Sequence, residues 1–211
     1  MYTREFWDEI YQKHFSDAPW MSDEWAKDGT RLLENYIPPA PPHGCILDYG
    51  CGNALISEHF MHKGHKLELA EISDELTKWL KIKYENTIIH LVNSPHEIEG
   101  RNKYDFVIAW GLFHHINPNL WGSFLDSFHR LMKNDAMIFI SGWDDSDSIL
   151  KQEKKLGRFT RKRVWYINLL DDIFRWRIND FDLLESRIIP FKLNAFPQER
   201  MIRFIVARNI K

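Results

Sequence analysis

Short apolar runs alternate along the chain with longer stretches whose apolar residues recur at helical spacing. The short runs predict buried strands at residues 45–50, 66–73, 87–94, 104–111 and 136–143. The longer stretches predict helices at residues 53–64, 74–84 and 119–133. Alternation of strand and helix is typical of a parallel sheet covered by helices on both faces. The pattern therefore predicts an α/β fold.

The N-terminal part departs from this alternation. Residues 1–36 carry a helical pattern without strands, and the proline-rich stretch at residues 38–43 breaks it, because proline cannot continue a helix. We therefore expect an N-terminal helical cap over residues 1–40 and a main domain over residues 41–211.

The C-terminal part departs from it as well. Residues 145–180 are charged and aromatic, and we expect a mostly helical insertion there. Two apolar runs, residues 181–189 and 200–209, then follow one another without a helix between them. They predict an antiparallel pair at the edge of the sheet, which brings the expected strands to seven in a doubly wound, mostly parallel arrangement.

Two glycines follow the first predicted strand, in the stretch CILDYGCGNALIS at residues 45–57. In a doubly wound sheet, ligands bind beyond the carboxyl ends of the strands. Gly50 can adopt backbone angles that other residues avoid, and Gly52 lets a ligand approach the main chain. A glycine pair alone is weak evidence, because any tight strand-to-helix turn can require one.

An acidic residue at the end of the second predicted strand strengthens the hypothesis of a ligand site. Glu71 lies 19 residues after Gly52 (71 minus 52). A carboxylate there would lie beside the glycine turn and could accept hydrogen bonds from both hydroxyls of a ribose. The alternative is an ordinary acid at a strand end. Asp48, next to the glycines, suits a cationic ligand group better than a phosphate.

Four motifs, in order, resemble those of the class I S-adenosylmethionine-dependent methyltransferases. They are ILDYGCGNALIS, LAEISDELTKWLK, HLVNSPHEI and YDFVIAWGLFHHI, and the resemblance covers residues 44–145 well. The sequence departs from the family at Ala54, where glycine is common, and at Ser94, where aspartate is common. The resemblance implies a Rossmann-like sheet, S-adenosyl-L-methionine as the cofactor and methyl transfer as the activity.

The resemblance also assigns roles to individual residues. Gly50, Cys51 and Gly52 would carry the amino-acid part of the cofactor, with Asp48 near its ammonium group. Glu71 would bind the ribose. The remaining expected contacts are Ile72 on the adenine face, Asn93, Ser94 and Pro95 along the adenine edge, and Trp110 and Gly111 near the methionine portion.

His114 and His115 follow the fourth predicted strand and are candidate catalytic residues. Methyl transfer from a sulfonium is an in-line displacement, so the protein mainly aligns the acceptor and, for some acceptors, supplies a base. Histidine titrates near neutral pH and can serve as that base or bind the substrate. A purely structural role for the pair is the alternative.

Aromatic residues near the N-terminus suggest a cover for the acceptor pocket. Electron-rich rings such as those of Trp7, Tyr11 and Trp20 suit a cationic sulfonium. Simple packing of a short helix on the sheet is the alternative for each of them.

Charge and composition narrow the choice of partner. The net charge of -2 argues against a nucleic-acid partner, although basic residues gather at Arg158, Arg161, Lys162 and Arg163 beside aromatic rings. We interpret that segment as a solvated face. His59, His62 and His65 recur at metal-ligand spacing, but no further ligand completes a shell, and we predict no metal site.

The remaining features indicate a cytoplasmic protein. The N-terminus is too charged for a signal peptide, no apolar run is long enough for a membrane span, and the cysteines suit a reducing compartment. The sequence therefore predicts a methyltransferase with a small-molecule acceptor. The alternatives are a non-catalytic protein that binds S-adenosylmethionine and an RNA methyltransferase, and the oligomeric state is left open.

Overall fold

The computed structural model describes residues 3–14, 22–38, 44–147, 165–191 and 200–211, and all structural statements below concern these residues. The strands are β1 (Cys45–Tyr49), β2 (Lys66–Glu71), β3 (Ile88–Leu91), β4 (Tyr104–Ala109), β5 (Met132–Trp143), β6 (Phe181–Phe191) and β7 (Arg200–Asn209). The α-helices are α1 (Arg4–His14), α2 (Asp23–Leu33), α3 (Leu55–His62), α4 (Asp74–Lys83), α5 (Trp121–Leu131) and α7 (Leu169–Trp176). Three short 3-10 helices are η2 (Pro95–Glu97), η3 (Phe113–His115) and η4 (Pro118–Leu120).

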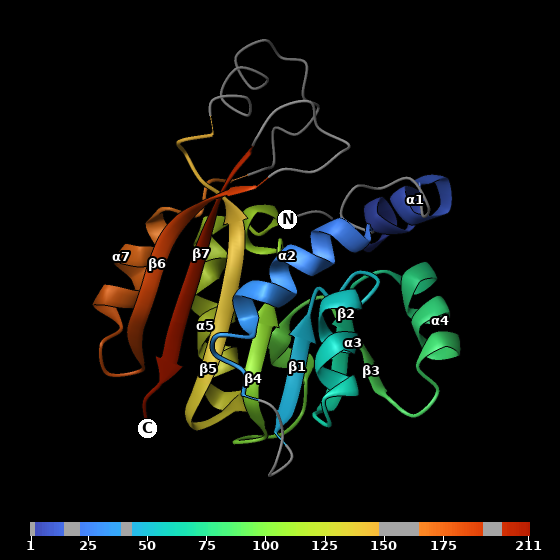
Figure 1. The fold of residues 1–211 in the computed structure, drawn as a ribbon, viewed down its shortest axis with the longest axis horizontal. Coiled ribbons are helices and arrows are strands. Elements are labelled where there is room, and N and C mark those ends of the chain that lie inside the picture. Colours follow the sequence, from blue (N-terminus) through green and yellow to red (C-terminus); the bar gives the residue numbers. More distant parts are fainter. Residues whose placement is uncertain (1–2, 15–21, 39–43, 148–164, 192–199) are drawn as a thin grey trace.

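The strands form a seven-stranded sheet with the order β3-β2-β1-β4-β5-β7-β6 (Figure 1). Strands β1 to β5 run parallel, and β7 runs antiparallel to both β5 and β6. The predicted doubly wound, mostly parallel sheet with an antiparallel hairpin at its C-terminal edge is thereby confirmed.

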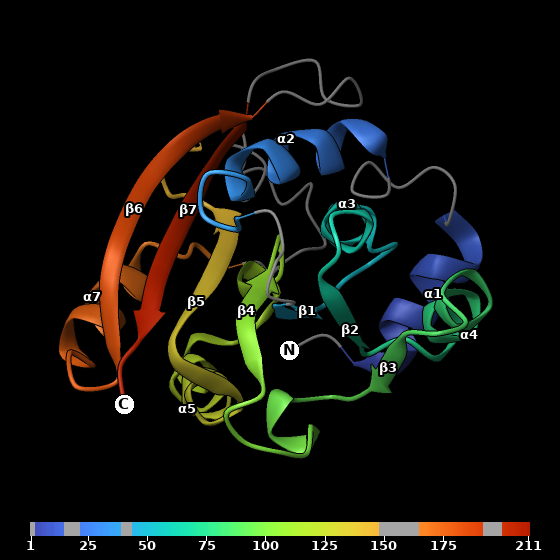
Figure 2. The ribbon, with the colours of Figure 1, turned by 60° about the horizontal axis from the view of Figure 1, so that its bottom comes forward.

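Helices cover both faces of the sheet, as the alternating pattern predicts (Figures 1 and 2). Successive residues of a strand point to opposite faces. On β1, Ile46 therefore joins the core cluster under α2, α3 and α4, whereas Leu47 joins the cluster that contains residues of α5 and α7. Both side chains are fully buried, so neither face of the central strands meets solvent.

The strand order reverses direction between β1 and β4. From β1 the chain passes through α3 to β2, and from β4 it passes through α5 to β5 on the other side. The carboxyl ends of both strands, at Tyr49 and Ala109, lie at the same sheet edge because the strands are parallel neighbours. This is the position where open α/β sheets bind ligands.

Local signals in the sequence explain where the helices next to this edge begin and end. The Ser73 hydroxyl accepts a hydrogen bond from the Leu76 N–H at 3.2 Å and so caps the N-terminus of α4. Gly64 has a φ of 94° directly after the C-cap of α3 and ends that helix. Both residues stand at the ends of the helices predicted at residues 53–64 and 74–84.

The edge hairpin is tied to the rest of the fold by a buried ionic group. Arg203 on β7 contacts Asp144, which follows β5, through its Nε at 2.7 Å, and Asp171 on α7 through its Nη1 at 2.6 Å. The Ser186 hydroxyl on β6 donates to Asp171 at 2.7 Å. The group therefore joins three elements of the C-terminal half with β5.

The N-terminal helices occupy different places. Leu33 and Ile37, at and after the end of α2, belong to the core cluster on the α3 face of the sheet. Helix α1 instead packs against α4 (Figure 2). The expected separation of an N-terminal cap from a main domain at residue 40 stays a prediction, since residues 39–43 lie outside the described part of the chain.

In the described part of the expected helical insertion, the α-helix spans Leu169–Trp176. Residues 165–167 are not helical. Trp165 donates its N–H to the His114 carbonyl at 2.8 Å, and Ile167 donates to the Trp143 carbonyl at 3.0 Å. Helix formation begins only at Leu169, because the preceding backbone donors bond to other segments. Residues 148–164 lie outside the described residues.

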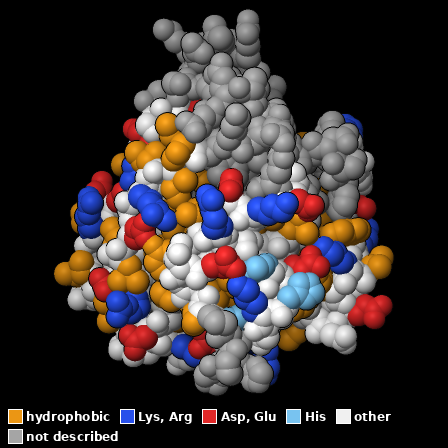
Figure 3. Space-filling model, viewed as in Figure 1, with side chains coloured by type: hydrophobic (Ala, Val, Ile, Leu, Met, Phe, Trp, Pro, Cys, Tyr) orange, Lys and Arg blue, Asp and Glu red, His pale blue; other side chains and the backbone are white. Residues whose placement is uncertain are grey.

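The surface carries charges of both signs. On the face shown in Figure 3, Lys and Arg side chains are interspersed with Asp and Glu. Among the described residues, no helix combines the length and the apolar character needed to cross a membrane.

Candidate functional site

The turn from β1 to α3 has three residues in left-handed backbone conformations. Gly50 has a φ of 71°, Gly52 of 56° and Ala54 of 58°. A Cβ on Gly50 would lie 2.9 Å from Leu112 Cδ1, whereas a Cβ on Gly52 would meet nothing within 4 Å. The positive φ therefore favours glycine at position 50, and Gly52 leaves the main chain open to a ligand. Ala54 adopts the conformation at a cost of about 1 kcal/mol that glycine would avoid.

Cys51 lies between the two glycines and faces the interior of the turn. Its thiol approaches the Gly52 carbonyl at 3.7 Å. Burial raises the pKa of this thiol well above its ordinary value, so the sulfur stays protonated at neutral pH. Cys51 therefore packs against the core cluster beside the turn in its thiol form.

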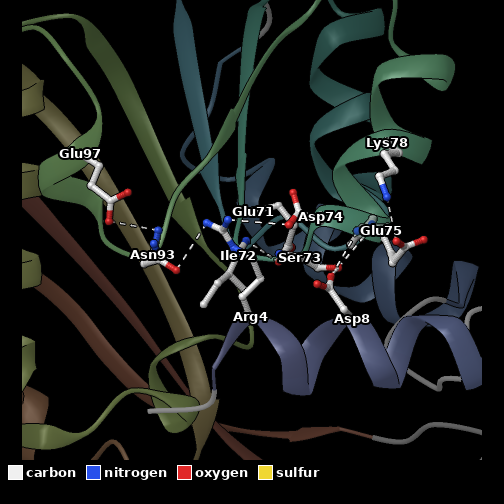
Figure 4. A network of polar contacts seen from close by, with 11 residues as sticks. Arg4, Asp8, Glu71, Ile72, Ser73, Asp74, Glu75, Lys78, Asn93 and Glu97 are labelled. Atoms are coloured by element: carbon white, nitrogen blue, oxygen red, sulfur yellow. Dashed lines mark hydrogen bonds and ion pairs between the residues drawn. The ribbon is translucent and has the colours of Figure 1, made fainter.

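Glu71 fastens this turn to the neighbouring strand end. Its carboxylate accepts hydrogen bonds from the N–H groups of Gly52 at 3.2 Å, Ile72 at 2.7 Å and Ser73 at 3.3 Å (Figure 4). The side chain is 5% exposed, and burial raises its pKa although the three backbone donors lower it. The predicted neighbourhood of Glu71 and the glycine turn is present.

Asp48 is buried on β1, two residues before the glycine turn. It is 3% exposed, and its carboxylate accepts a hydrogen bond from the Ser57 hydroxyl on α3. Burial raises the pKa of Asp48 to about 7, the Ser57 hydrogen bond lowers it and the nearby charge of Glu71 raises it further. The group therefore changes charge near neutral pH.

This raised pKa predicts that Asp48→Asn stabilises the protein at high pH. In the unfolded chain the carboxyl ionises around its ordinary pKa of 3.8, and in the folded protein only around 7. The folded state thus binds the extra proton, and the free energy of unfolding falls as the pH rises through this window. Asparagine has no charge to desolvate, and we expect a gain on the order of 2 kcal/mol above pH ~8 that disappears near pH ~4.

Chemical denaturation of both proteins across this pH range measures the difference. An equal stability difference at both ends of the range would show that the Asp48 carboxyl does not titrate as described.

The residues expected at the adenine edge lie in the turn after β3. The Asn93 N–H donates to Glu97 Oε1 at 3.2 Å, which closes the turn (Figure 4). Ser94 Oγ lies 2.7 Å from His96 Nδ1, and Pro95 is buried at the start of η2. The structure therefore brings Asn93, Ser94 and Pro95 to the sheet edge that holds Glu71, because β2 and β3 are parallel neighbours.

Helix α1 contributes two residues that the sequence analysis did not assign to the site. Asp8 Oδ1 accepts hydrogen bonds from the Ser73 hydroxyl at 2.5 Å and the Glu75 N–H at 3.2 Å. Arg4 lies 3.7 Å from Asp74 and donates to Asn93 Oδ1 at 3.5 Å. Figure 4 shows both side chains reaching from α1 toward the ends of β2 and β3. Their spacing of four residues places them on one helix face, but that pattern also describes a solvated face.

The turn after β4 packs against the glycine turn. Gly111 has a φ of 67° and donates its N–H to the Ser141 hydroxyl on β5 at 2.8 Å. The next residue, Leu112, is the side chain that a Cβ on Gly50 would contact first. Trp110 is 7% exposed and packs on the α2 side of the sheet, with its ring centroid 6.0 Å from that of Phe204. Ser141 was not assigned to the site from the sequence, since nothing local distinguishes it from other strand serines.

His114 and His115 lie next to one another beneath α1. Their ring centroids are 3.9 Å apart. His114 is 5% exposed and lies 5.6 Å from the Trp143 ring, while the His115 ring packs edge-on against Trp7 of α1 at 5.1 Å. Trp7 also stacks on Tyr11 at 6.1 Å. Of the expected cover aromatics, Trp7 therefore contacts His115 and Tyr11 contacts Trp7, while Trp20 lies outside the described residues.

The remaining histidines and basic residues noted in the sequence make contacts outside the candidate site. His59 Nε2 lies 2.8 Å from Glu34 Oε1, and His65 Nε2 lies 2.8 Å from the Pro38 carbonyl. Among the described residues, no group of three or more His, Cys, Asp or Glu could hold a metal ion. Arg175 and Arg177 both pair with acids of the described chain, and residues 158–163 fall outside it.

Comparison with known proteins identifies the sequence family. Residues 18–188 match the family described as "Methyltransferase domain". No curated protein sequence matches this chain.

Solved structures share the fold. The 1,6-didemethyltoxoflavin-N1-methyltransferase of Burkholderia thailandensis, solved with bound 1,6-didemethyltoxoflavin and S-adenosylhomocysteine, has a TM-score of 0.73 at 15% identity, with 99% of this chain and 87% of that chain covered. The magnesium protoporphyrin IX methyltransferase of Synechocystis PCC 6803, solved with S-adenosylhomocysteine, has a TM-score of 0.71 at 15% identity, with 98% and 97% covered. A putative sarcosine dimethylglycine methyltransferase of Galdieria sulphuraria has a TM-score of 0.65 at 13% identity, with 89% and 85% covered.

Proposed function

This chain belongs to the methyltransferase domain family, and we propose that it transfers a methyl group from S-adenosylmethionine to a small-molecule acceptor. The observation that carries the proposal is the joint geometry of Gly52 and Glu71. Gly52 exposes open main chain, and its N–H is held by a buried carboxylate that has acceptor capacity left for hydroxyl groups. An open backbone beside an acid at the end of the second strand suits a nucleoside with an amino-acid tail.

The residues present fit the cofactor. Glu71 would accept hydrogen bonds from the ribose hydroxyls, and Ile72 with Asn93 would border the adenine. Gly52 would admit the methionine portion, and the buried Asp48 carboxyl would become charged beside its ammonium group. When bound, S-adenosylmethionine supplies a methyl group that its sulfonium already activates for displacement.

The remaining roles belong to the neighbouring turns. Gly50 and Cys51 would shape the glycine turn, and Ser94 and Pro95 would shape the turn after β3. Trp110 and Gly111 would border the methionine portion of the cofactor from the turn after β4. His114 and His115 would orient the acceptor or take its proton, since imidazole is the side chain best suited to proton exchange near neutral pH.

A small acceptor is supported by the position of α1. Trp7 of this helix packs against His115, so a molecule that approaches the histidines must fit beneath a helix. The two neighbours solved with S-adenosylhomocysteine are named for small-molecule substrates.

Two measurements test the proposal. Calorimetry should show binding of S-adenosylhomocysteine to the purified protein. With labelled S-adenosylmethionine and a cell extract, label should enter the low-molecular-mass fraction and should persist after the extract is treated with ribonuclease. Absence of binding would overturn the proposal, and ribonuclease-sensitive labelling would instead identify an RNA acceptor. Binding without label transfer would favour a non-catalytic protein.

The Gly52→Ala variant tests which part of the cofactor contacts the glycine turn. The added methyl group enters open space, so it should hinder the methionine portion and weaken S-adenosylhomocysteine binding by about tenfold while adenosine binding changes little. Gly100→Ala is the matched control, because Gly100 also has a positive φ, of 108°, but lies away from the site. Equal losses for both ligands would place the glycine turn away from the methionine tail.

A further inference from the structure

Arg4, at the first turn of α1, lies in front of the two turns assigned to the nucleoside. Its Nη1 is 3.7 Å from Asp74 at the start of α4, and its Nη2 donates to Asn93 Oδ1 after β3 at 3.5 Å. Figure 4 shows the side chain extending from α1 between Asn93 and Ile72. Both contacts are long for hydrogen bonds of a charged group, which are usually below 3 Å.

The guanidinium has more donors than these contacts use. Arginine carries five N–H groups in a fixed plane and accepts no hydrogen bond. The Nε of Arg4 is shielded from solvent and has no acceptor among the described residues. A shielded donor without an acceptor costs free energy, which a hydrogen bond to a ligand at this position would recover.

The helix that carries Arg4 is anchored beside this position. One helical turn later, Asp8 binds the Ser73 hydroxyl and the Glu75 N–H at the N-terminus of α4. Two residues before Ser73 lies Glu71, whose carboxylate holds the glycine turn. The Asp8 anchor thus holds Arg4 close to both the proposed ribose acid and the proposed adenine edge.

We propose that Arg4 is a cofactor-binding residue that donates hydrogen bonds to the adenosine portion of S-adenosylmethionine. The chemistry of the two sides is complementary. Glu71 only accepts and so matches the ribose hydroxyl protons, whereas adenine ring nitrogens and ribose oxygens are acceptors for an arginine. A planar guanidinium can also stack on the base. This assignment rests on the proposed function, because it requires an adenosyl ligand.

The test compares two ligands on matched variants. Arg4→Met keeps much of the side-chain length and removes all donors, and it should weaken both adenosine and S-adenosylhomocysteine by about tenfold or more in calorimetry. Arg4→Lys keeps the charge beside Asp74 but loses the planar donor set, and it should recover only part of this loss. Lys13→Met removes an exposed charge from the same helix and should leave both affinities unchanged.

Hydrogen exchange separates ligand binding from helix anchoring. If Arg4 contacts the nucleoside, the amides of α1 in ligand-free Arg4→Met exchange as in the wild-type protein while the affinities fall. Faster exchange of α1 in that variant, with an equal affinity loss in Asp8→Asn, would reduce Arg4 to a structural residue and overturn the proposal.

The outcomes also distinguish this proposal from the proposed function. Wild-type protein that binds no S-adenosylhomocysteine contradicts the function itself. Wild-type protein that binds it, together with an unchanged Arg4→Met variant, removes only Arg4 from the site.

Discussion

Glu71→Gln should weaken binding of S-adenosylhomocysteine by about 10- to 100-fold, because each lost hydrogen bond to a charged acceptor costs about 1.5 kcal/mol or more. The substitution preserves shape but replaces one carboxylate oxygen by an amide NH2. That group cannot accept from a ribose hydroxyl or from the Gly52 N–H, which the native carboxylate binds at 3.2 Å. Adenosine should lose affinity by a similar factor, since it carries the same ribose.

The experiment needs a control variant for binding and a separate measurement of folding. Glu75→Gln changes a carboxylate on the first turn of α4 whose partner is the exposed Lys78, and it should leave affinity unaltered. Because Glu71 also holds three backbone N–H groups, the melting temperature of Glu71→Gln reports any loosening of the turn. A folded Glu71→Gln protein with wild-type affinity would exclude Glu71 from the ribose site.

Arg203→Met should lower the free energy of unfolding by about 3–5 kcal/mol, the usual cost of breaking a buried ion pair from one side. Arg203 is paired with Asp144 at 2.7 Å and Asp171 at 2.6 Å, and the Asp144 side chain has no solvent exposure. Methionine fills much of the volume but leaves both carboxylates without their cation. Chemical denaturation near pH ~7 measures the loss.

Arg208→Met is the matched control on the same strand. Arg208 lies 3.8 Å from Asp182, and both side chains are largely exposed, so its loss should cost at most about 0.5 kcal/mol. Adding Asp144→Asn to Arg203→Met should restore part of the stability, because one uncompensated charge is then removed. Similar losses for Arg203 and Arg208 would show that the buried group contributes little.

This ion group also determines how the free energy of unfolding changes with pH. Burial alone would raise the pKa of Asp144, but hydrogen bonds from Ser146 and the contact with Arg203 outweigh it and hold the pKa below the ordinary 3.8. A carboxyl with a lowered pKa stabilises the fold above that value, and the contribution is lost as the pH falls further. Asp48 acts in the opposite direction, since its pKa is raised.

Features repeated locally along the chain could be predicted from the sequence. The alternation of apolar runs gave the parallel strands and their helices, and the 19-residue interval from Gly52 to Glu71 corresponds to a direct hydrogen bond. These follow from the repeating geometry of a strand, a helix and the next strand, which fixes where each strand ends.

Contacts between distant segments could not be predicted in this way. Ser141 becomes important only because Gly111, which follows the neighbouring strand β4, donates a hydrogen bond to its hydroxyl. Likewise, the helical pattern of residues 165–167 is overridden by hydrogen bonds to His114 and Trp143 carbonyls. Periodicity reports which side of an element is apolar, but it carries no information about the partner that a polar side chain will find.

The anchoring of α1 has a consequence for biosynthesis. Asp8 binds Ser73, 65 positions later in the chain, and Trp7 packs on His115 later still. During translation, α1 therefore cannot make both of these contacts until about half of the polypeptide has left the ribosome. Until then it remains an exposed amphipathic segment. Nascent chains that stall before β4 would display it to chaperones.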